Sequence, residues 1–347
     1  MKFYTKQHPY YCGIDLHARS LYVCILDQTG DTCVHKEISA RPDTLQTVLE
    51  PYLGHVVVGV ECMHCWYWVA DFCADIGVEF ILGHALYMRA IHGGKAKNDR
   101  IDSYKIANLI RGGNFPLAYV YPKALRATRD LLRRRMKLVR HGADLKAHVA
   151  NTTSQYNLPP NKVNLKNVGA REHLKTAFPD PVVQKNMDLN MAVLNCYAKE
   201  LSKIEWFIEQ QAKQHNPVHL HLLKTISGIG RILALTIIYE IGDIGRFESV
   251  QTFASYARLV KCKAESAGKS YGTQGNKIGN AHLKWAFSEA AVLYLRGNKK
   301  AQQYVQKLQR RMSKAKALSA LAHKLGRCVY FMLKNETVFD ESKFLKG

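Results

Sequence analysis

Acidic side chains are scarce in this chain of 347 residues: 28 are Asp or Glu, against 50 Lys or Arg, and the formal net charge is +22. The imbalance is uneven, because residues 1–100 carry nine basic and eleven acidic side chains, whereas residues 251–347 carry nineteen basic and five acidic ones. A near-neutral first part and a strongly basic last part indicate a site that uses acidic side chains, joined to a surface that binds a polyanion. No long basic segment with a clean apolar face is present, so nucleic acid is favoured over a membrane surface as the partner.

Long apolar runs are also missing. The first residues lack the apolar core of a signal peptide, and no run approaches the ~18 residues that a membrane span needs. The longest run, Ile232 to Ile241, has the length of a core helix. The nine cysteines are odd in number and follow no disulfide spacing, which favours the reducing cytoplasm.

Cys62 and Cys65 form a Cys-x-x-Cys pair with His64 between them. A structural zinc site needs about four ligands, and the sequence offers no second closely spaced pair. Reduced, partly buried thiols are therefore favoured here, with zinc or redox chemistry as the alternative.

The first 120 residues alternate between strand and helix patterns. A continuous β-branched run ending at Glu61 predicts a strand buried on both faces, and three earlier runs predict strands joined by hairpins. The predicted strands are Tyr10 to Asp15, Leu21 to Leu26, Thr32 to Ile38, Val56 to Glu61 and Glu79 to Leu82, and the predicted helices are Asp43 to Leu53 and Trp66 to Ile76. This order indicates a mixed α/β sheet of the RNase H type.

The middle of the chain favours long helices. One is predicted from Leu125 to Ala150 and another from Asn190 to His215, with a Pro-containing linker or mobile insert, Thr152 to Asp188, between them. The second helix has an apolar seam of coiled-coil spacing that could pair two chains or two segments of one chain. The seam consists of Leu194, Tyr197, Leu201, Ile204 and Ile208. We therefore expect a catalytic domain at residues 1–120, coiled-coil-like helices at 121–218 and a helical C-terminal domain at 219–347.

Four carboxylates are placed where a metal site could form. Asp15 and Glu61 end predicted strands, at the rim of the sheet where ligands bind. Asp99 and Asp102 are three residues apart at the start of a predicted helix and face the same way. Four converging carboxylates need a cation, and oxygen ligands suit Mg²⁺ or Mn²⁺, which can promote phosphoryl transfer as a pair. A helix cap at Asp99 and a surface acid at Asp102 are the alternative roles.

Cations crowd the first long helix, where Asp130 is the nearby acid that could offset them. They are Arg126, Arg129, Arg133, Arg134, Arg135, Lys137 and Arg140. Because such a group repels itself, a bound nucleic-acid backbone explains it better than solvent does.

Two glycine-containing segments follow in the basic half. Gly228 and Gly230 form a Gly-x-Gly turn between helices, typical of a helix-hairpin-helix element, whose amides can hold a phosphate. A tight interhelical turn explains the same glycines. The second segment is a Gly/Ser/Lys-rich loop from Lys261 to Asn280 that could admit a phosphate and help ionise a hydroxyl. Its lysines are Lys261, Lys263, Lys269 and Lys277.

The segments Gly13-Ile14-Asp15, Val60-Glu61 and Lys97-Asn98-Asp99-Arg100-Ile101-Asp102 resemble the DEDD transposases of bacterial insertion sequences. That family has a RuvC-like catalytic domain and includes the pilin-gene invertase. The resemblance implies that Asp15, Glu61, Asp99 and Asp102 are its metal tetrad. The family usually follows its Glu with Thr and Gly, where this chain has Cys62, Met63 and His64.

The Gly-rich loop and the preceding Tyr256 to Leu259 resemble the C-terminal domain of the same family, in which a loop serine is the nucleophile that links covalently to DNA. By position that serine is Ser266, with Ser270 as the competing candidate and a phosphate-gripping role as the alternative for Ser266. The family often has Thr-Pro after the leucine, where this chain has Val260 and Lys261.

The resemblance further implies a composite active site and a structured bridge RNA that pairs with donor and target DNA. We expect a homo-oligomer, dimer or tetramer, associated with the nucleoid. A junction-resolving nuclease that uses the same carboxylates is one alternative, and a non-catalytic nucleic-acid binder is another.

Overall fold

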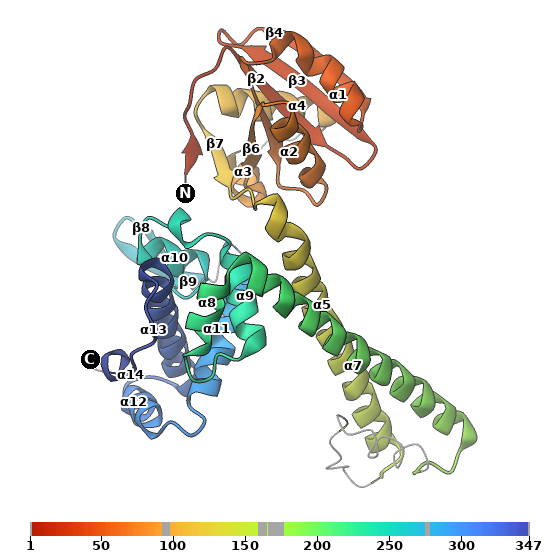
Figure 1. The fold of residues 1–347 in the computed structure, drawn as a ribbon, viewed down its shortest axis with the longest axis vertical. Coiled ribbons are helices and arrows are strands. Elements are labelled where there is room, and N and C mark those ends of the chain that lie inside the picture. The colour runs from red at the N-terminus through yellow and green to blue at the C-terminus, as the bar shows by residue number, and fades with distance from the viewer. Residues whose placement is uncertain (1, 92–97, 159–164, 166–176, 275–277, 346–347) are drawn as a thin grey trace. The chain divides into compact units, whose positions relative to one another are not determined.

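The computed structural model describes residues 2–91, 98–158, 165, 177–274 and 278–345. The chain folds into two units, Met1–Lys123 and Ala124–Gly347, which are taken one at a time below (Figure 1). No helix within the described ranges is long and apolar enough to cross a membrane.

A mixed seven-stranded sheet forms the centre of the N-terminal unit, in the order β1-β7-β6-β5-β2-β3-β4. Its strands are β1 (Phe3–Tyr4), β2 (Tyr10–Leu16), β3 (Ser20–Asp27), β4 (Thr32–Ser39), β5 (Val56–Glu61), β6 (Glu79–Gly83) and β7 (Phe115–Ala118). β2, β5 and β6 are parallel, whereas β3 and β4 continue from β2 as antiparallel hairpins. This arrangement fits the RNase H-like α/β domain that the sequence predicts.

Helices cover both faces of this sheet. They are α1 (Pro42–Leu49) with the 3₁₀ turn η1 (Glu50–Tyr52), α2 (Trp66–Asp75), α3 (Ala85–Ile91) and α4 (Asp99–Arg111). Cys12, Ile14 and Leu16 of β2 share a core with α1 and α2. The opposite face packs against α4, where Tyr11 shares a core with Ile106. Successive residues of β2 therefore point to opposite faces, which decides which of them lie under α4.

In the C-terminal unit, two long helices run side by side, α5 (Lys123–Gln155) and α7 (Pro181–His215) (Figure 1). Leu194 shares a core with Val149 of α5, and Ile208 shares one with Leu132 of α5. The apolar seam of α7 therefore packs within the chain.

Much of the predicted linker, residues 159–164 and 166–176, lies outside the described residues, but its last part is helical. α7 begins at Pro181 and not at Asn190, because proline is tolerated in a first helical turn and the Asp180 side chain accepts a hydrogen bond from the N–H of Val182.

Further helices, of which α13 is the longest, enclose the large core of this unit. They are α8 (Pro217–Lys224), α9 (Arg231–Ile241), the 3₁₀ turn η2 (Ile244–Arg246), α10 (Val250–Tyr256), α11 (Ala281–Tyr294), α12 (Lys299–Gln309), α13 (Lys314–Asn335) and α14 (Glu341–Phe344). The interpretation of Lys261 to Asn280 as a loop is wrong in part, because β8 (Cys262–Ser266) and β9 (Lys269–Gln274) form a hairpin there. Ala267 and Gly268, with φ of 50° and 73°, make a two-residue turn whose twist suits paired strands.

Candidate metal centre and nucleic-acid interface

Two paired glycines let α4 lie close to the sheet. Gly13 of β2 pairs with Gly59 of β5. A Cβ on Gly13 would stand 2.3 Å from the backbone N of Ala107 and 2.4 Å from the carbonyl O of Ser103, both in α4. A Cβ on Gly59 would stand 2.5 Å from Cδ1 of Ile110 in the same helix. Because these two residues have no side chain, α4 can lie close to β2 and β5.

Asp15 and Glu61 occupy equivalent positions at the carboxyl ends of neighbouring parallel strands. Ile14 pairs with Val60, so the residues that follow them come side by side. Each carboxylate lies two residues beyond one of the paired glycines and therefore on the face that α4 covers. Both side chains are partly exposed, which leaves them accessible to a hydrated ion.

Asp99 and Asp102 come from the first turn of α4. The helix cap is Asn98, whose Oδ1 accepts a hydrogen bond from the N–H of Ile101 at 2.8 Å, so the alternative role of Asp99 as the cap is wrong. Asp99 is left 53% exposed, and Oδ1 of Asp102 lies 3.7 Å from Nζ of Lys105.

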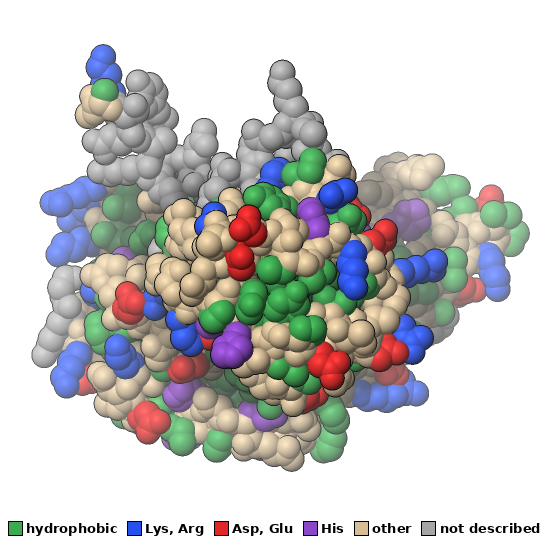
Figure 2. Space-filling view, turned by 90° about the horizontal axis from the view of Figure 1, so that it is seen from above, with side chains coloured by type: hydrophobic (Ala, Val, Ile, Leu, Met, Phe, Trp, Pro, Cys, Tyr) green, Lys and Arg blue, Asp and Glu red, His purple; other side chains and the backbone are tan. Residues whose placement is uncertain are grey.

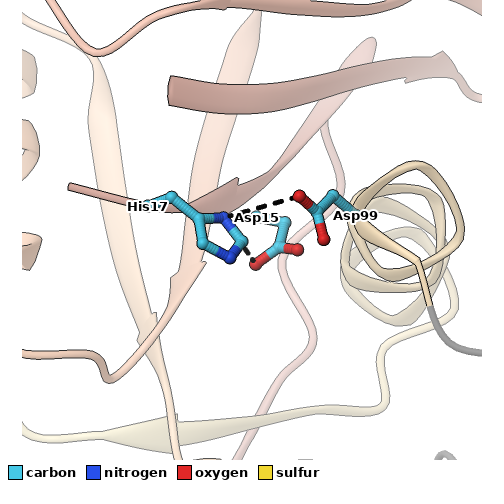
Figure 3. A group of neighbouring side chains, drawn as sticks. All are labelled: Asp15, His17 and Asp99. Carbon is cyan, nitrogen blue, oxygen red and sulfur yellow. Dashed lines mark ion pairs between the residues drawn. The ribbon is translucent and has the colours of Figure 1, made fainter. Parts of the chain in front are cut away.

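The side chains of Asp15, His17 and Asp99 converge where β2 meets the start of α4 (Figure 3). Nδ1 of His17 lies 3.9 Å from Oδ1 of Asp15 and 3.9 Å from Oδ2 of Asp99. One potential ligand atom from each residue lies within 4.8 Å of the others. Within the described part of the chain, Glu61 and Asp102 are not members of this group.

The chemistry of this donor set fits a divalent cation. Two carboxylates close together favour a cation between them, and carboxylate oxygens are ligands for Mg²⁺ and Mn²⁺. Sequence reasoning missed His17. The signal available was its position two residues after Asp15, which puts both on one face of the extended chain.

Ser266 stands beside the turn of the β8–β9 hairpin, where it pairs with Lys269. The base of the hairpin segment is closed by Nε of Arg258, which donates to the carbonyl of Ile278 at 3.0 Å. Among the other residues predicted in this segment, Ser270 lies on β9 opposite Glu265, Lys261 precedes β8, Lys263 lies on β8, and Lys277 falls outside the described residues.

Two family models match the chain: a DEDD transposase model of the IS110 type over residues 12–158, and the transposase IS116/IS110/IS902 family over residues 220–306. The first range contains all four predicted carboxylates and the second contains Ser266. The chain belongs to the DEDD-type IS110 family of transposases. No curated protein matches it. Membership supports an enzyme that cuts and recombines DNA, and it suggests the use of a divalent metal.

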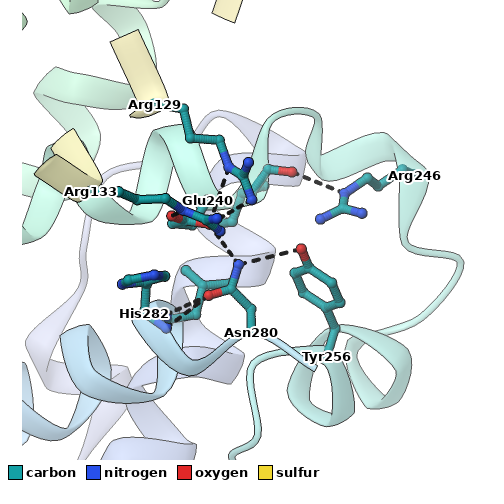
Figure 4. Close-up of polar contacts among 9 residues, drawn as sticks. Arg129, Arg133, Glu240, Arg246, Tyr256, Asn280 and His282 are labelled. Carbon is teal, nitrogen blue, oxygen red and sulfur yellow. Dashed lines mark hydrogen bonds and ion pairs between the residues drawn. The ribbon is translucent and has the colours of Figure 1, made fainter. Parts of the chain in front are cut away.

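In the transposase, some of the cations of α5 are paired with a buried acid of the same chain (Figure 4). Glu240 of α9 is 1% exposed and accepts hydrogen bonds from Nε of Arg129 at 3.3 Å and from Nε and Nη2 of Arg133 at 2.7 and 2.9 Å. Nδ2 of Asn280 donates to the same carboxylate at 2.7 Å. The expectation that these cations repel one another for want of an acid is wrong for Arg129 and Arg133, because their acidic partner lies over a hundred residues away in the sequence.

The charge state of Glu240 follows from these contacts. Burial acts to raise its pKa, but the hydrogen bond from Arg133 and the charges of Arg129 and Arg133 outweigh burial and lower the pKa to about 2. A buried carboxylate held ionised in this way joins α5, α9 and the start of α11.

The other α5 cations divide into two groups. Arg126 is buried, and Nη2 of Arg135 lies 2.6 Å from Oε1 of Glu205 in α7. Arg134, Lys137 and Arg140 are exposed. Among the seven predicted cations of α5, these three are therefore the ones placed for an external polyanion.

The Gly-x-Gly turn of the transposase joins α8 to α9. Gly228 has a φ of 86°, and a Cβ there would lie 2.5 Å from the backbone N of Tyr294, so packing on α11 explains this glycine. Gly230 is exposed at the start of α9, and a Cβ there would meet no atom within 4 Å. Its neighbour Arg231 pairs with Glu205 at 2.9 Å.

Proposed function

We propose that this transposase cuts and rejoins DNA with a carboxylate site, made by Asp15, Glu61, Asp99 and Asp102, and with Ser266 as the nucleophile. The observation that carries the proposal is the convergence of Asp15 and Asp99, from the end of β2 and the start of α4, with Glu61 beside Asp15 in the sheet. Mg²⁺ or Mn²⁺ bound there would stabilise the charge that develops on the phosphate.

The four carboxylates are carried by two kinds of element, strands and a helix. The strands hold Asp15 and Glu61 at a fixed spacing, and the first turn of α4 carries both Asp99, which converges with Asp15, and Asp102. A metal ion held by these carboxylates would contact the phosphate and not the bases, so target choice would come from other partners.

In the proposed step, Oγ of Ser266 attacks the phosphorus of a phosphodiester. The serine O–H bond and one P–O ester bond break, a serine–phosphorus ester forms, and the proton ends on the leaving DNA hydroxyl. The ester retains the bond energy, so the reverse attack by a DNA hydroxyl rejoins a strand without an external energy source. A serine hydroxyl is a weak nucleophile at neutral pH, and Lys269, its partner across the hairpin turn, is the candidate for assisting it.

The same proposal includes the nucleic-acid partners. Donor and target DNA and a structured guide RNA would contact the exposed cations Arg134, Lys137 and Arg140, the amide of Gly230 and the lysines of the hairpin. We propose a homo-oligomer in which residues 1–120 cut, residues 121–218 form the helical middle and residues 219–347 carry the helix-hairpin-helix and the serine.

Asp15→Asn and Asp99→Asn test the carboxylate site. Both variants should lose metal-dependent strand cleavage while binding DNA as the wild type does, because a ligand is lost and the cationic surface is unchanged. Asp75→Asn, an exposed acid at the end of α2, is the matched control and should cleave normally. Normal cleavage by both site variants would overturn the assignment.

A metal-dependent junction endonuclease is the second candidate. It is favoured by the fact that all four carboxylates belong to one unit of the chain, which could hydrolyse DNA without Ser266. Hydrolysis would leave no bond between protein and DNA.

A further inference from the structure

His17 is the first residue after β2. Its N–H donates to the carbonyl of Ser20 at 3.0 Å and so closes the turn into β3. Leu16 is buried on the opposite face, so His17 follows Asp15 on the face that α4 covers. The backbone therefore fixes this imidazole beside the carboxylate site.

Nδ1 of His17 makes only long ion pairs with the two carboxylates and no close hydrogen bond to either. A charged hydrogen bond from an imidazole would bring its nitrogen within ~3 Å of one carboxylate oxygen. Nδ1 of His17 instead lies 3.9 Å from an oxygen of Asp15 and equally far, 3.9 Å, from one of Asp99 (Figure 3). The imidazole nitrogen therefore faces both carboxylates at the same distance.

These separations suit three ligands of one ion. With metal–ligand distances of ~2.0–2.2 Å, ligand atoms lie ~3 Å apart when adjacent and ~4 Å apart when opposite. The three ligand atoms lie within 4.8 Å of one another, and small rotations of these partly exposed side chains would shorten the two 3.9 Å separations towards the ~3 Å of adjacent ligands.

We propose that His17 binds the metal ion of the carboxylate site through Nδ1 and shifts the preference of that site from Mg²⁺ towards Mn²⁺. The inference rests on the proposed metal site and adds a nitrogen ligand to its oxygens. Mg²⁺ favours oxygen ligands, whereas an imidazole suits first-row transition metals.

The test uses the full chain loaded with Mn²⁺ alone and examined by electron spin-echo spectroscopy, which detects a directly bound ¹⁴N. The wild type should show imidazole nitrogen coupling, and His17→Gln should bind Mn²⁺ without it. Because losing even an outer partner of a ligand costs roughly tenfold in affinity, the Mn²⁺-to-Mg²⁺ affinity ratio of His17→Gln should fall by about tenfold or more in calorimetry. His55→Gln, an exposed histidine at the other end of β5, is the matched control and should keep both properties.

The outcomes separate this inference from the site on which it rests. Mn²⁺ that binds the wild type without nitrogen coupling, or coupling that survives in His17→Gln, overturns the role of His17 and leaves the carboxylate site intact. Mn²⁺ binding that is absent in the wild type, or unchanged in Asp15→Asn, overturns the metal site and the inference together.

Discussion

At Gly13 and Gly59 the strands carry no Cβ, and atoms of α4 fill the space that a side chain would take. Asp99 stands at the start of that helix and Asp15 two residues beyond Gly13, so the spacing of helix and sheet is also the spacing of the two carboxylates. Gly13 contributes no ligand atom to the site, yet it controls the distance between the two carboxylates.

Gly13→Ala should therefore destabilise the protein by roughly 3 kcal/mol or more and weaken Mn²⁺ binding, because its Cβ meets backbone atoms that cannot rotate away. Denaturant unfolding and calorimetry measure the two effects. Gly54→Ala is the control: its φ of 79° strains an alanine by about 1–2 kcal/mol, but a Cβ there meets no atom within 4 Å. Equal losses in the two variants would mean that contact with α4 is not the cause.

Glu240 gives the protein a specific acid sensitivity. Its pKa of about 2 lies below the ordinary value of 4.5. Since the folded-state pKa is lowered, the stability that Glu240 contributes is present above about pH 4.5 and is lost as the pH falls towards 2.

Glu240→Gln should cost roughly 3–5 kcal/mol at neutral pH, because two arginines lose their buried partner. Its unfolding free energy should then fall less steeply than that of the wild type below about pH 4.5. Glu200→Gln, a partly exposed acid of α7 whose pKa is lowered by a hydrogen bond from Lys203, should change the slope much less than Glu240→Gln. Parallel slopes for Glu240→Gln and the wild type would contradict the assigned ionisation.

At the scale of elements, α5 combines two kinds of cation. Arg129 and Arg133 are hydrogen-bonded to Glu240, whereas Arg134, Lys137 and Arg140 are exposed. Residues adjacent in sequence therefore have different functions: the paired ones hold the fold, and we propose that the exposed ones contact phosphates.

Replacing Arg134, Lys137 and Arg140 together with Ala should weaken nucleic-acid binding for all sequences alike. The slope of log affinity against log salt should become shallower by about two to three units, since up to three phosphate contacts disappear. The folding control is Arg133→Ala, which should mainly lower stability. An unchanged salt slope in the triple variant would show that these cations are merely solvated.

The elements that the sequence predicted are those with strong periodicity: β2 to β6, α1, α2, α5 and α7. β1 and β7 were missed because β1 has two residues and β7 contains Pro116, which weakens a strand pattern. The β8–β9 hairpin was missed because its Gly, Ser and Lys composition is typical of a loop. The partners of the α5 arginines were beyond local reasoning, since Glu240 lies 107 residues from Arg133.

For the whole molecule, the charge asymmetry and the two matched ranges indicate a division of labour. The near-neutral N-terminal part contains the predicted carboxylates, and the basic C-terminal part contains the predicted serine. Acidic and basic side chains are interspersed on the face drawn in Figure 2, so the positive surplus is not segregated there. The sequence located Asp15 and Asp99, but the convergence of His17 with them required the fold.

The central claim is that both parts act on DNA through a covalent intermediate. The direct measurement is to incubate the full chain with labelled DNA and Mg²⁺, denature it, and map any labelled peptide. The account predicts label on the peptide that contains Ser266, lost in Ser266→Ala together with recombination and retained in Ser270→Ala. Recombination by Ser266→Ala, or nicked DNA without any adduct from the wild type, would contradict it and favour the endonuclease.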